Sequence, residues 1–345
     1  MISVLGHNTD LEPEKMDGDK TMTCRHCAGR LLRKLFPDRM EIHDKRRDNN
    51  DKLERTRPNV HLTREQWIEK IEEQYRDKTG NALDLDNPQR YTAKIQWRKL
   101  YDKNPMYSVL ADKYAVRQWV KDKIGEEYLI PLLGVWERAE DIDFRLLPES
   151  FVLKTNSASA ANIIVRDKKD INRKLIIEQL NYWLEFPFWA KYGEFHYKEI
   201  PPKIIAERYM QCEGTDDLTD YKFLCFNGKP CYCTVEVDRF HGHKQLVYDS
   251  DWILQDWRIN QFESYSGSIE KPAQFETMLG LAETLSKGFS HVRVDLYLSR
   301  QKIYFGEMTF TPGSGYVSIV PDEYDYILGE QWTLDSDKTY YRSQH

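Results

Sequence analysis

Alternating hydrophobic and polar residues near the end of the chain predict a β-hairpin over residues 292–309. From 292 to 298 every second residue is apolar, and Arg293 and Asp295 occupy the opposite face. A short polar turn follows, and residues 302–309 alternate again. On this second strand Ile303, Phe305, Glu307 and Thr309 fall on one parity. The pattern therefore predicts two neighbouring strands that each carry a carboxylate, Asp295 and Glu307.

The same kinds of pattern predict the other elements. A capping box of Thr63 and Gln66 begins a helix over 63–79, and Asn227–Gly228 is the turn of a second hairpin over 220–237. Helical spacing predicts further helices that begin near Thr92 and that cover 108–125, 171–185, 272–288 and part of 321–334. Strands are predicted over 128–136, 151–154, 162–165 and 203–210.

Residues 1–57 differ from the rest of the chain. A short amphipathic patch around Leu35 is followed by a charged run, 44–57, that has almost no apolar residue. Such runs are usually solvated or disordered, so we expect an appendage outside the core. Cys24 and Cys27 form a CxxC pair, but His26 and His43 do not complete a zinc site at suitable spacing. Reduced thiols are expected, and metal binding by this pair stays open.

Length, composition and charge restrict the function. A chain of 345 residues with 40% hydrophobic residues can hold two or three domains. The net charge of −6 argues against a nucleic-acid-binding fold. No apolar run is long enough to span a bilayer, and the N-terminus has no signal-peptide hydrophobic region. We expect a cytoplasmic protein, with its oligomeric state left open.

The two predicted hairpin carboxylates suit a divalent cation. Adjacent strands lie roughly 5 Å apart, so facing carboxylates can share one or two cations. Mg²⁺ prefers a few carboxylates together with substrate phosphates, and Arg293 would complement charge on a phosphoryl group in transfer. The alternative is an ordinary hairpin with exposed acids and a surface Arg–Asp pair.

A second stretch suits phosphate. The predicted strand 151–154 ends in Lys154, and the loop 155–161 that follows consists of small side chains. Small side chains let backbone N–H groups approach a phosphate closely, and Lys154 adds a fixed positive charge. A plain hairpin is the alternative for this stretch.

The segment RVD, a turn and then GEMTFTPG, from Arg293 to Gly313, resembles the metal-binding hairpin of ATP-grasp ligases such as D-alanine–D-alanine ligase. More specifically, residues 83–334 resemble the TupA-like ATP-grasp family, found among bacterial cell-surface polysaccharide genes. The resemblance implies an α+β ATP-grasp fold, in which two α+β lobes grip ATP, with an N-terminal helical appendage. The implied boundaries are an appendage at 1–57, a helical region at 58–150, a small nucleotide-binding lobe at 151–210 and a C-terminal lobe with the metal hairpin at 211–345.

The resemblance also implies roles for single residues. Lys113, Lys154 and Lys222 would hold the ATP phosphates, with Ser157 and Ser159 in a loop that lacks the glycines common in the family. Glu207, Arg208, Met210 and Glu213 would surround the base and ribose. Asp295, Glu307 and Thr309 would bind Mg²⁺, although ATP-grasp hairpins usually have asparagine at the position of Thr309. Arg293, Lys222 and Gly313 would be catalytic, and Arg239, Ser314 and Gly315 would contact the substrate.

The activity implied by the resemblance is ATP-dependent ligation of a carboxylate to an amine through an acyl phosphate. The carboxylate would belong to a uronic acid, an amino acid or a peptide, in polysaccharide or secondary-metabolite biosynthesis. One alternative is a kinase of the same fold that phosphorylates a hydroxyl group. Another is a nucleotide-binding module without catalysis, which the glycine-free loop favours. A glycosyltransferase is a weaker alternative, because the two acids stand on different strands.

Overall fold

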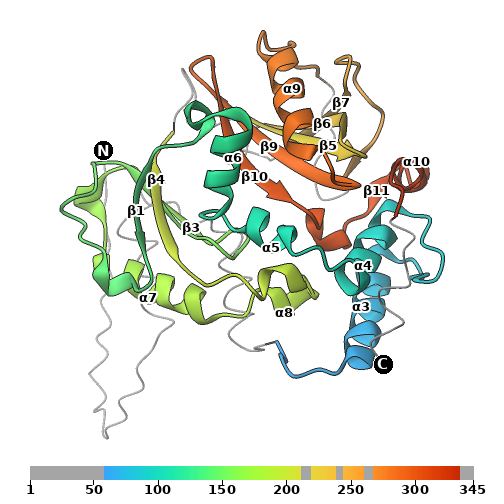
Figure 1. Ribbon diagram of the computed structural model, residues 1–345, viewed down its shortest axis with the longest axis horizontal. Helices are drawn as coiled ribbons and strands as arrows, with labels where there is room; N and C mark the ends of the chain where they lie inside the picture. The colour runs from blue at the N-terminus through green and yellow to red at the C-terminus, as the bar shows by residue number, and fades with distance from the viewer. Residues whose placement is uncertain (1–57, 211–218, 238–243, 260–266, 335–345) are drawn as a thin grey trace, which may run out of the picture. The chain divides into compact units, whose positions relative to one another are not determined.

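The computed structural model describes residues 58–210, 219–237, 244–259 and 267–334, and all of these belong to one unit of the chain. Two antiparallel sheets dominate this part of the protein (Figure 1). The predicted appendage at 1–57 and the predicted site residues Glu213 and Arg239 lie outside the described residues. None of the described helices is long and apolar enough to cross a membrane.

The smaller sheet has four strands in the order β1-β4-β2-β3. These are β1 (Leu132–Trp136), β2 (Phe151–Thr155), β3 (Asn162–Val165) and β4 (Ile204–Arg208). Helix α7 (Arg173–Glu185) buries Ile176, Leu180 and Trp183 against Phe151, Leu153 and Ile163 of the sheet. β1 pairs with β4 in this sheet, although it lies before residue 151, where the predicted small lobe begins.

The larger sheet has five strands in the order β10-β9-β5-β6-β7. They are β5 (Thr219–Phe226), β6 (Lys229–Val237), β7 (Lys244–Asp249), β9 (His291–Ser299) and β10 (Lys302–Thr309). Helix α9 (Phe275–Ser286) covers one face, where Phe275, Met278 and Ala282 join Phe223 and Val294 in the main core (Figure 1). The opposite face of this sheet carries polar side chains and forms one wall of the site.

Both predicted hairpins are confirmed. β5 and β6 meet at Asn227–Gly228, which have φ of 51° and 77°, the left-handed conformation that this two-residue turn requires. β9 and β10 meet at Arg300–Gln301, also with positive φ. The remaining paired strands are short: β8 (Arg258–Ile259) and β11 (Ile319–Val320) form a two-stranded ribbon.

Helices surround the two sheets. The capping box predicted at Thr63 and Gln66 is present at the start of α3 (Arg64–Thr79). Helix α4 (Tyr91–Tyr101) carries the buried Arg98, whose guanidinium donates to the carbonyl oxygens of His291 and Phe310 at 2.7 and 3.1 Å. The others are α5 (Met106–Ala111), α6 (Val116–Ile124), α8 (Trp189–Tyr192) and α10 (Glu323–Gln331), with the short 3₁₀ turns η1 (Glu126–Tyr128), η2 (Ala139–Asp141), η3 (Lys168–Asp170), η4 (Phe195–Tyr197) and η5 (Pro312–Gly315).

The prediction of one helix over 108–125 was wrong. The segment contains two helices, α5 and α6, that are separated at Asp112–Ala115. The Asp112 carboxylate accepts hydrogen bonds from the backbone N–H groups of Tyr114 and Ala115, as a capping side chain does. Lys113 therefore lies in a loop between helices, and its backbone N–H donates to the carbonyl oxygen of Asn156 at 3.2 Å.

The prediction that Glu307 and Thr309 share the face of Ile303 and Phe305 on β10 was also wrong. Register shifts between Phe305 and Glu307, so that Phe305 pairs with Leu296 and Glu307 pairs with Asp295. The extra residue of this β-bulge is Gly306. After the bulge, Met308 joins Ile303 and Phe305 among the buried core residues, whereas Glu307 and Thr309 lie on the opposite, polar face.

Candidate nucleotide and metal site

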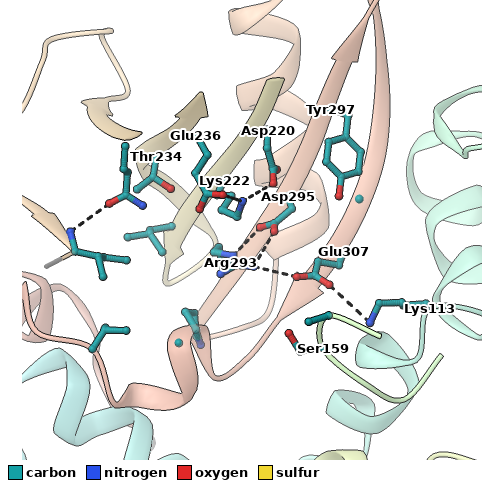
Figure 2. Close-up of a pocket in the computed structure, with 18 of the residues that line it drawn as sticks. Lys113, Ser159, Asp220, Lys222, Thr234, Glu236, Arg293, Asp295, Tyr297 and Glu307 are labelled. Carbon is teal, nitrogen blue, oxygen red and sulfur yellow. Dashed lines mark hydrogen bonds and ion pairs between the residues drawn. The ribbon is translucent and has the colours of Figure 1, made fainter. Parts of the chain in front are cut away.

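A cavity of about 590 Å³ lies between the two sheets. Lys154 and Glu207 of the smaller sheet line it. The larger sheet contributes Asp220, Lys222, Arg293, Asp295 and Glu307 (Figure 2). Its volume falls within the range of roughly 300–1,000 Å³ that is usual for small-molecule sites. The cavity is therefore large enough for a substrate, and about a third of the residues that line it are charged.

Asp295 and Glu307 are brought together by strand register. Glu307 pairs directly with Asp295 across β9 and β10, and Lys222 of β5 pairs with Asp295 from the other side. Arg293 donates two hydrogen bonds to Asp295, both of 2.7 Å, and its Nη2 also contacts Glu307 Oε1 at 3.0 Å. The same Nη2 lies 3.1 Å from Thr309 Oγ1. One guanidinium therefore contacts all three predicted metal ligands.

Burial and neighbouring charge act differently on the two acids. Burial raises the pKa of Asp295 to about 7, against the opposing effect of Arg293 and Lys222. Burial acts in the same direction on Glu307, but Lys113, Arg293 and Lys222 together lower its pKa to about 2. Two neighbouring carboxylates whose pKa values are shifted in opposite directions are typical of sites that bind a cation or move a proton.

Charges alternate along the wall formed by the larger sheet (Figure 2). Lys222 bridges Asp220 and Glu236, with 2.9 Å to the carboxylate of Glu236. At the other end of the row, Lys113 Nζ lies 3.9 Å from Glu307 Oε2 and donates to the carbonyl oxygen of Ala158 at 2.9 Å. Burial lowers the pKa of Lys113, whereas the acids around Lys222 outweigh burial and raise its pKa.

Glu207 joins two cations on the wall of the smaller sheet. Lys154 Nζ lies 2.7 Å from Glu207 Oε2, and Arg117 Nη1 lies 3.1 Å from Glu207 Oε1. Arg117, from α6, also donates to the carbonyl oxygen of Ile130 at 2.7 Å. Lys154 is thus held at the end of β2, next to the small-residue loop, by a carboxylate that is only 7% exposed.

The loop between β2 and β3 lies at the edge of the cavity. The buried Asn156 fixes its start, because its amide donates to Asp112 at 2.9 Å and its Oδ1 accepts from Lys203 N at 2.7 Å. Ala158, Ser159, Ala160 and Ala161 line the cavity. Ser159 is labelled next to Lys113 and Glu307 in Figure 2, while Ser157 is not among the lining residues.

The turn η5 follows β10 and closes one side of the cavity. Gly313, Ser314 and Gly315 all have positive φ, between 54° and 64°. The side chains of Gln96 and Lys99 hold this turn from α4: Gln96 Nε2 donates to Gly315 O at 2.7 Å, and Lys99 Nζ donates to Ser314 O at 2.5 Å. Gly313 lines the cavity, whereas the carbonyl oxygens of Ser314 and Gly315 point toward α4, where they accept hydrogen bonds from Gln96.

The structure brings most of the predicted site residues to one cavity but not all of them. Lys113, Lys154, Ser159, Glu207, Lys222, Arg293, Asp295, Glu307 and Gly313 line it, and Thr309 contacts Arg293. Arg208 is exposed, and neither it nor Met210 is among the lining residues. Sequence reasoning missed Arg117, Asp220, Thr234 and Glu236, which also line the cavity. The last three could have been found, since strand alternation around Lys222 puts them on its face of the β5–β6 hairpin.

Gly306 offers a test of how the bulge aligns the acids. A Cβ at this position would lie 2.9 Å from the Tyr297 ring and 3.0 Å from the backbone oxygen of Asp295. We expect Gly306→Ala to destabilise the protein by about 1–3 kcal/mol, as over-packing does, and to weaken binding of an ATP analogue in calorimetry. Gly280→Ala in helix α9 makes the same change at a control position, because no atom lies within 4 Å of the Cβ that alanine would add there. Alanine stabilises a helix by about 1 kcal/mol relative to glycine, so this variant should not be destabilised. Unchanged nucleotide affinity in Gly306→Ala would contradict this prediction.

The donor set determines which metal these residues could hold. Among the described residues, no group of three or more His, Cys, Asp or Glu side chains is arranged to bind a metal. Asp295, Glu307 and Thr309 offer two carboxylates and a hydroxyl, all hard oxygen ligands. Such a set suits Mg²⁺, which takes one or two protein carboxylates and completes its shell with water and phosphate.

The sequence matches a known protein-family model. The model described as TupA-like ATPgrasp matches residues 93–333, which is most of the chain. No curated protein matched the sequence.

Several solved ATP-grasp enzymes resemble the structure at low identity. D-alanine–D-alanine ligase from Bacillus anthracis, complexed with ATP, has a TM-score of 0.35 and 15% identity over 59% of this chain and 55% of that one. The Helicobacter pylori ligase has a TM-score of 0.35 and 12% identity over 66% and 62%. The ATP-grasp ligase PsnB, complexed with its minimal precursor, Mg and ADP, has a TM-score of 0.36 and 13% identity over 70% and 66%. This chain spans less than two thirds of the length of either D-alanine–D-alanine ligase.

Proposed function

The chain belongs to the TupA-like ATP-grasp family, and on that premise we propose that it is an ATP-dependent ligase that joins a carboxylate to an amine. The observation that carries the proposal is the convergence of three lysines, Arg293 and the pair Asp295–Glu307 on one cavity. A triphosphate needs several fixed cations, and a phosphoryl transfer needs positioning and charge neutralisation more than a protein nucleophile.

Asp295, Glu307 and Thr309 would hold Mg²⁺, as their oxygen donors and their register suggest. When bound, Mg²⁺ neutralises charge on the β- and γ-phosphates. Arg293 touches all three of these side chains, so its guanidinium keeps their oxygens grouped on one face of the hairpin. The rigid fork of an arginine suits this task better than a lysine.

The three lysines would bind the phosphates of ATP from three directions. Lys113 reaches the cavity from the α5–α6 loop, Lys154 from the smaller sheet and Lys222 from the larger sheet. The adenosine would lie toward the end of β4, near Glu207, which lines the cavity, whereas Arg208 and Met210 follow Glu207 along the chain without lining it. Ser157 and Ser159 would contribute the loop that covers the phosphates.

The reaction would proceed in two steps. A carboxylate oxygen of the first substrate forms a bond to the γ-phosphorus while the bond to the β-phosphate oxygen breaks, which gives an acyl phosphate and ADP. The uncharged amine of the second substrate then forms a C–N bond to the carbonyl carbon of the acyl phosphate. The bond between this carbon and the phosphate oxygen breaks, phosphate leaves, and the nitrogen loses a proton. Arg293 and Lys222 would stabilise negative charge on the carbonyl oxygen, aided by the backbone N–H group of Gly313. Arg239 would bind a substrate carboxylate.

A screen of substrates tests the proposal. The purified protein is incubated with ATP, Mg²⁺ and pairs of one carboxylate and one amine, drawn from uronic acids, amino acids and short peptides. We expect phosphate release that requires both partners, with a product whose mass equals their sum minus one water. A phosphorylated acceptor formed without an amine would show a kinase instead. ATP binding without turnover for every pair would favour a module without catalysis.

A further inference from the structure

A buried lysine of α4, Lys99, has no part in the proposed chemistry. The residue is 6% exposed and is not among those that line the cavity. Its Nζ donates to three oxygens, which are Gln96 Oε1 at 2.8 Å, Tyr192 O at 2.9 Å and Ser314 O at 2.5 Å. All three acceptors are uncharged, whereas a buried ammonium is usually paired with a carboxylate. The position of this charge therefore calls for an explanation.

The three acceptors belong to different parts of the fold. Gln96 stands one turn earlier on α4, Tyr192 O lies at the C-terminal end of α8, and Ser314 O belongs to the turn η5. The ring of Tyr316, just after that turn, has its centroid 4.0 Å from Lys99 Nζ, which adds a cation–π contact. The ammonium therefore joins α4, α8 and η5 at one point. We call these contacts the Lys99 tie.

The turn η5 depends on such contacts because its backbone is strained. Ser314 has a φ of 54°, a left-handed conformation that a residue with a Cβ adopts at an energetic cost. Strain of this kind persists where the surrounding structure fixes the backbone. At the start of the turn Glu194 accepts a hydrogen bond from Thr311 Oγ1 at 2.5 Å, and in its middle Lys99 and Gln96 both donate to Ser314 O.

The strained turn lies directly against the candidate site. Gly313 precedes Ser314 and lines the cavity. Its φ is 57°, and a Cβ at this position would lie 2.6 Å from Val317 Cγ1. Tyr316 N donates to Gly313 O at 3.1 Å, so the turn is closed and its residues move together. A change in the contacts of Ser314 would therefore also move Gly313.

The number of hydrogen bonds that Lys99 can donate depends on its protonation. An ammonium has three N–H groups, one for each acceptor, whereas a neutral amine has two. Burial lowers the pKa of Lys99 to about 7, against the opposing effect of Glu194. Below this pH all three oxygens receive a hydrogen bond, and above it one of them loses its donor.

Other ionisable side chains surround this ammonium. They come from α4, α8, the η4 segment and the residue after η5, and they are Arg98, Tyr192, Glu194, His196 and Tyr316. Burial lowers the pKa of His196 to about 3 and raises the pKa of Tyr316, so neither side chain changes its charge near neutral pH. A titration of this cluster near pH 7 is therefore assigned to Lys99 rather than to the imidazole.

We propose that Lys99 is a positioning residue for the candidate site, whose ammonium holds the η5 turn in the conformation that places Gly313 against the cavity, and that loss of its proton loosens this hold. The inference rests on the proposed function for the reaction that the turn serves. The Lys99 tie itself does not depend on which substrate the site takes. It would make turnover depend on a side chain that lies outside the cavity.

The sequence allows Gly313 to be observed alone, because Pro312–Gly313 is its only Pro-Gly pair. The full chain is labelled with carbonyl-¹³C proline and ¹⁵N-glycine, and the amide of the glycine that follows a labelled carbonyl is recorded by NMR across neutral pH. We expect this signal to shift with a midpoint near pH 7 in the wild-type protein, as the pKa of Lys99 requires. The shift should be absent in Lys99→Met.

Two control variants assign this titration. Lys94 stands on the same helix and donates to Gly329 O and Trp332 O, both at 2.7 Å and both at α10 rather than η5, so Lys94→Met should keep the titration. Asp295→Asn should keep it as well, which excludes Asp295, a cavity residue whose pKa is also about 7. Lys99→Gln, which keeps a donor without the charge, replaces Lys99→Met if that variant does not fold.

Turnover provides a second measurement. With a substrate pair found in the screen, kcat of the wild-type protein is divided by kcat of Lys99→Met at each pH. Ionisation of the substrates affects both proteins alike and cancels in this ratio. We expect a ratio of at least about tenfold below the pKa of Lys99, as for loss of a hydrogen bond from a charged group, and a fall of about threefold or more above it. Affinity for a nonhydrolysable ATP analogue should not change.

Each result bears on a definite statement. A Gly313 signal that does not titrate in the wild-type protein, or that still titrates in Lys99→Met, would overturn the Lys99 tie. A ratio of kcat values that is constant with pH would show a merely structural role and overturn positioning by the charge. No turnover with any substrate pair, together with the expected titration of Gly313, would instead overturn the proposed function and leave the Lys99 tie in place.

Discussion

Asp295→Asn and Glu307→Gln should each reduce ATP turnover by at least about a thousandfold, because each removes a carboxylate that would hold Mg²⁺ against the phosphates. The amide side chains are nearly isosteric with the acids, so the strand pairing of β9 and β10 should survive. The measurement is phosphate release under the conditions of the substrate screen. Calorimetry with a nonhydrolysable ATP analogue, with and without Mg²⁺, provides a readout that does not need the second substrate.

The binding experiment should separate these variants from the wild-type protein in a specific way. Wild-type protein should bind the analogue more tightly with Mg²⁺ than without it, and both variants should lose most of this difference. Glu137→Gln is a matched control, because it makes the same change at an exposed acid that pairs with Lys203 outside the cavity. Retention of Mg²⁺-dependent binding within a factor of two in both site variants would refute the assignment of the metal ligands.

Arg293→Met should destabilise the fold and also abolish activity. Its guanidinium is the partner of Asp295 and Glu307, and Asp295 is only 2% exposed. Removing one partner of a buried ion pair leaves an uncompensated charge and typically costs about 3–5 kcal/mol. Urea unfolding should show a loss of this size, and phosphate release should fall by at least about a hundredfold, as it does when a group that stabilises transition-state charge is removed.

A second pair of variants distinguishes the structural role of Arg293 from its chemical role. Arg293→Lys should recover part of the stability but not the activity, because a single ammonium cannot make the two-pronged contact with Asp295. Combining Arg293→Met with Asp295→Asn should also recover stability, since the stranded carboxylate is gone, and should remain inactive. If the double variant were as unstable as Arg293→Met alone, the charge of Asp295 would not be the origin of the loss.

Local signals in the sequence were sufficient for much of the fold. The Asn227–Gly228 turn and the capping box at Thr63 depend on neighbours within a few residues, and both are confirmed. The placing of Asp295 and Glu307 on two neighbouring strands followed from two alternating runs with a short turn between them, and the pairing of those strands is confirmed. The family resemblance, now supported by the match over residues 93–333, was needed to link these elements to one candidate site.

Other features depend on contacts that a single segment does not encode. The helix break at Asp112 is stabilised partly by Asn156, which is 44 residues away, so periodicity alone favoured one continuous helix. The bulge at Gly306 interrupted the alternation that the prediction assumed, although the residues on either side of it alternate correctly once Gly306 is set aside. The ion pairs of Glu207 join β4, β2 and α6. Only the assembled fold reveals such groupings.

On the proposed function, the pairing of the lysines with acids would couple the binding of nucleotide to the binding of metal. Lys154 contacts Glu207, Lys222 contacts Asp220 and Glu236, and Lys113 approaches Glu307. A lysine that turns to a phosphate gives up part of its attraction to a carboxylate, and a divalent cation on the hairpin compensates that loss. Thermodynamic reciprocity then requires ATP to raise the affinity for Mg²⁺ by the same factor by which Mg²⁺ raises the affinity for ATP. On the proposed function, nucleotide without its cation would therefore bind this site poorly.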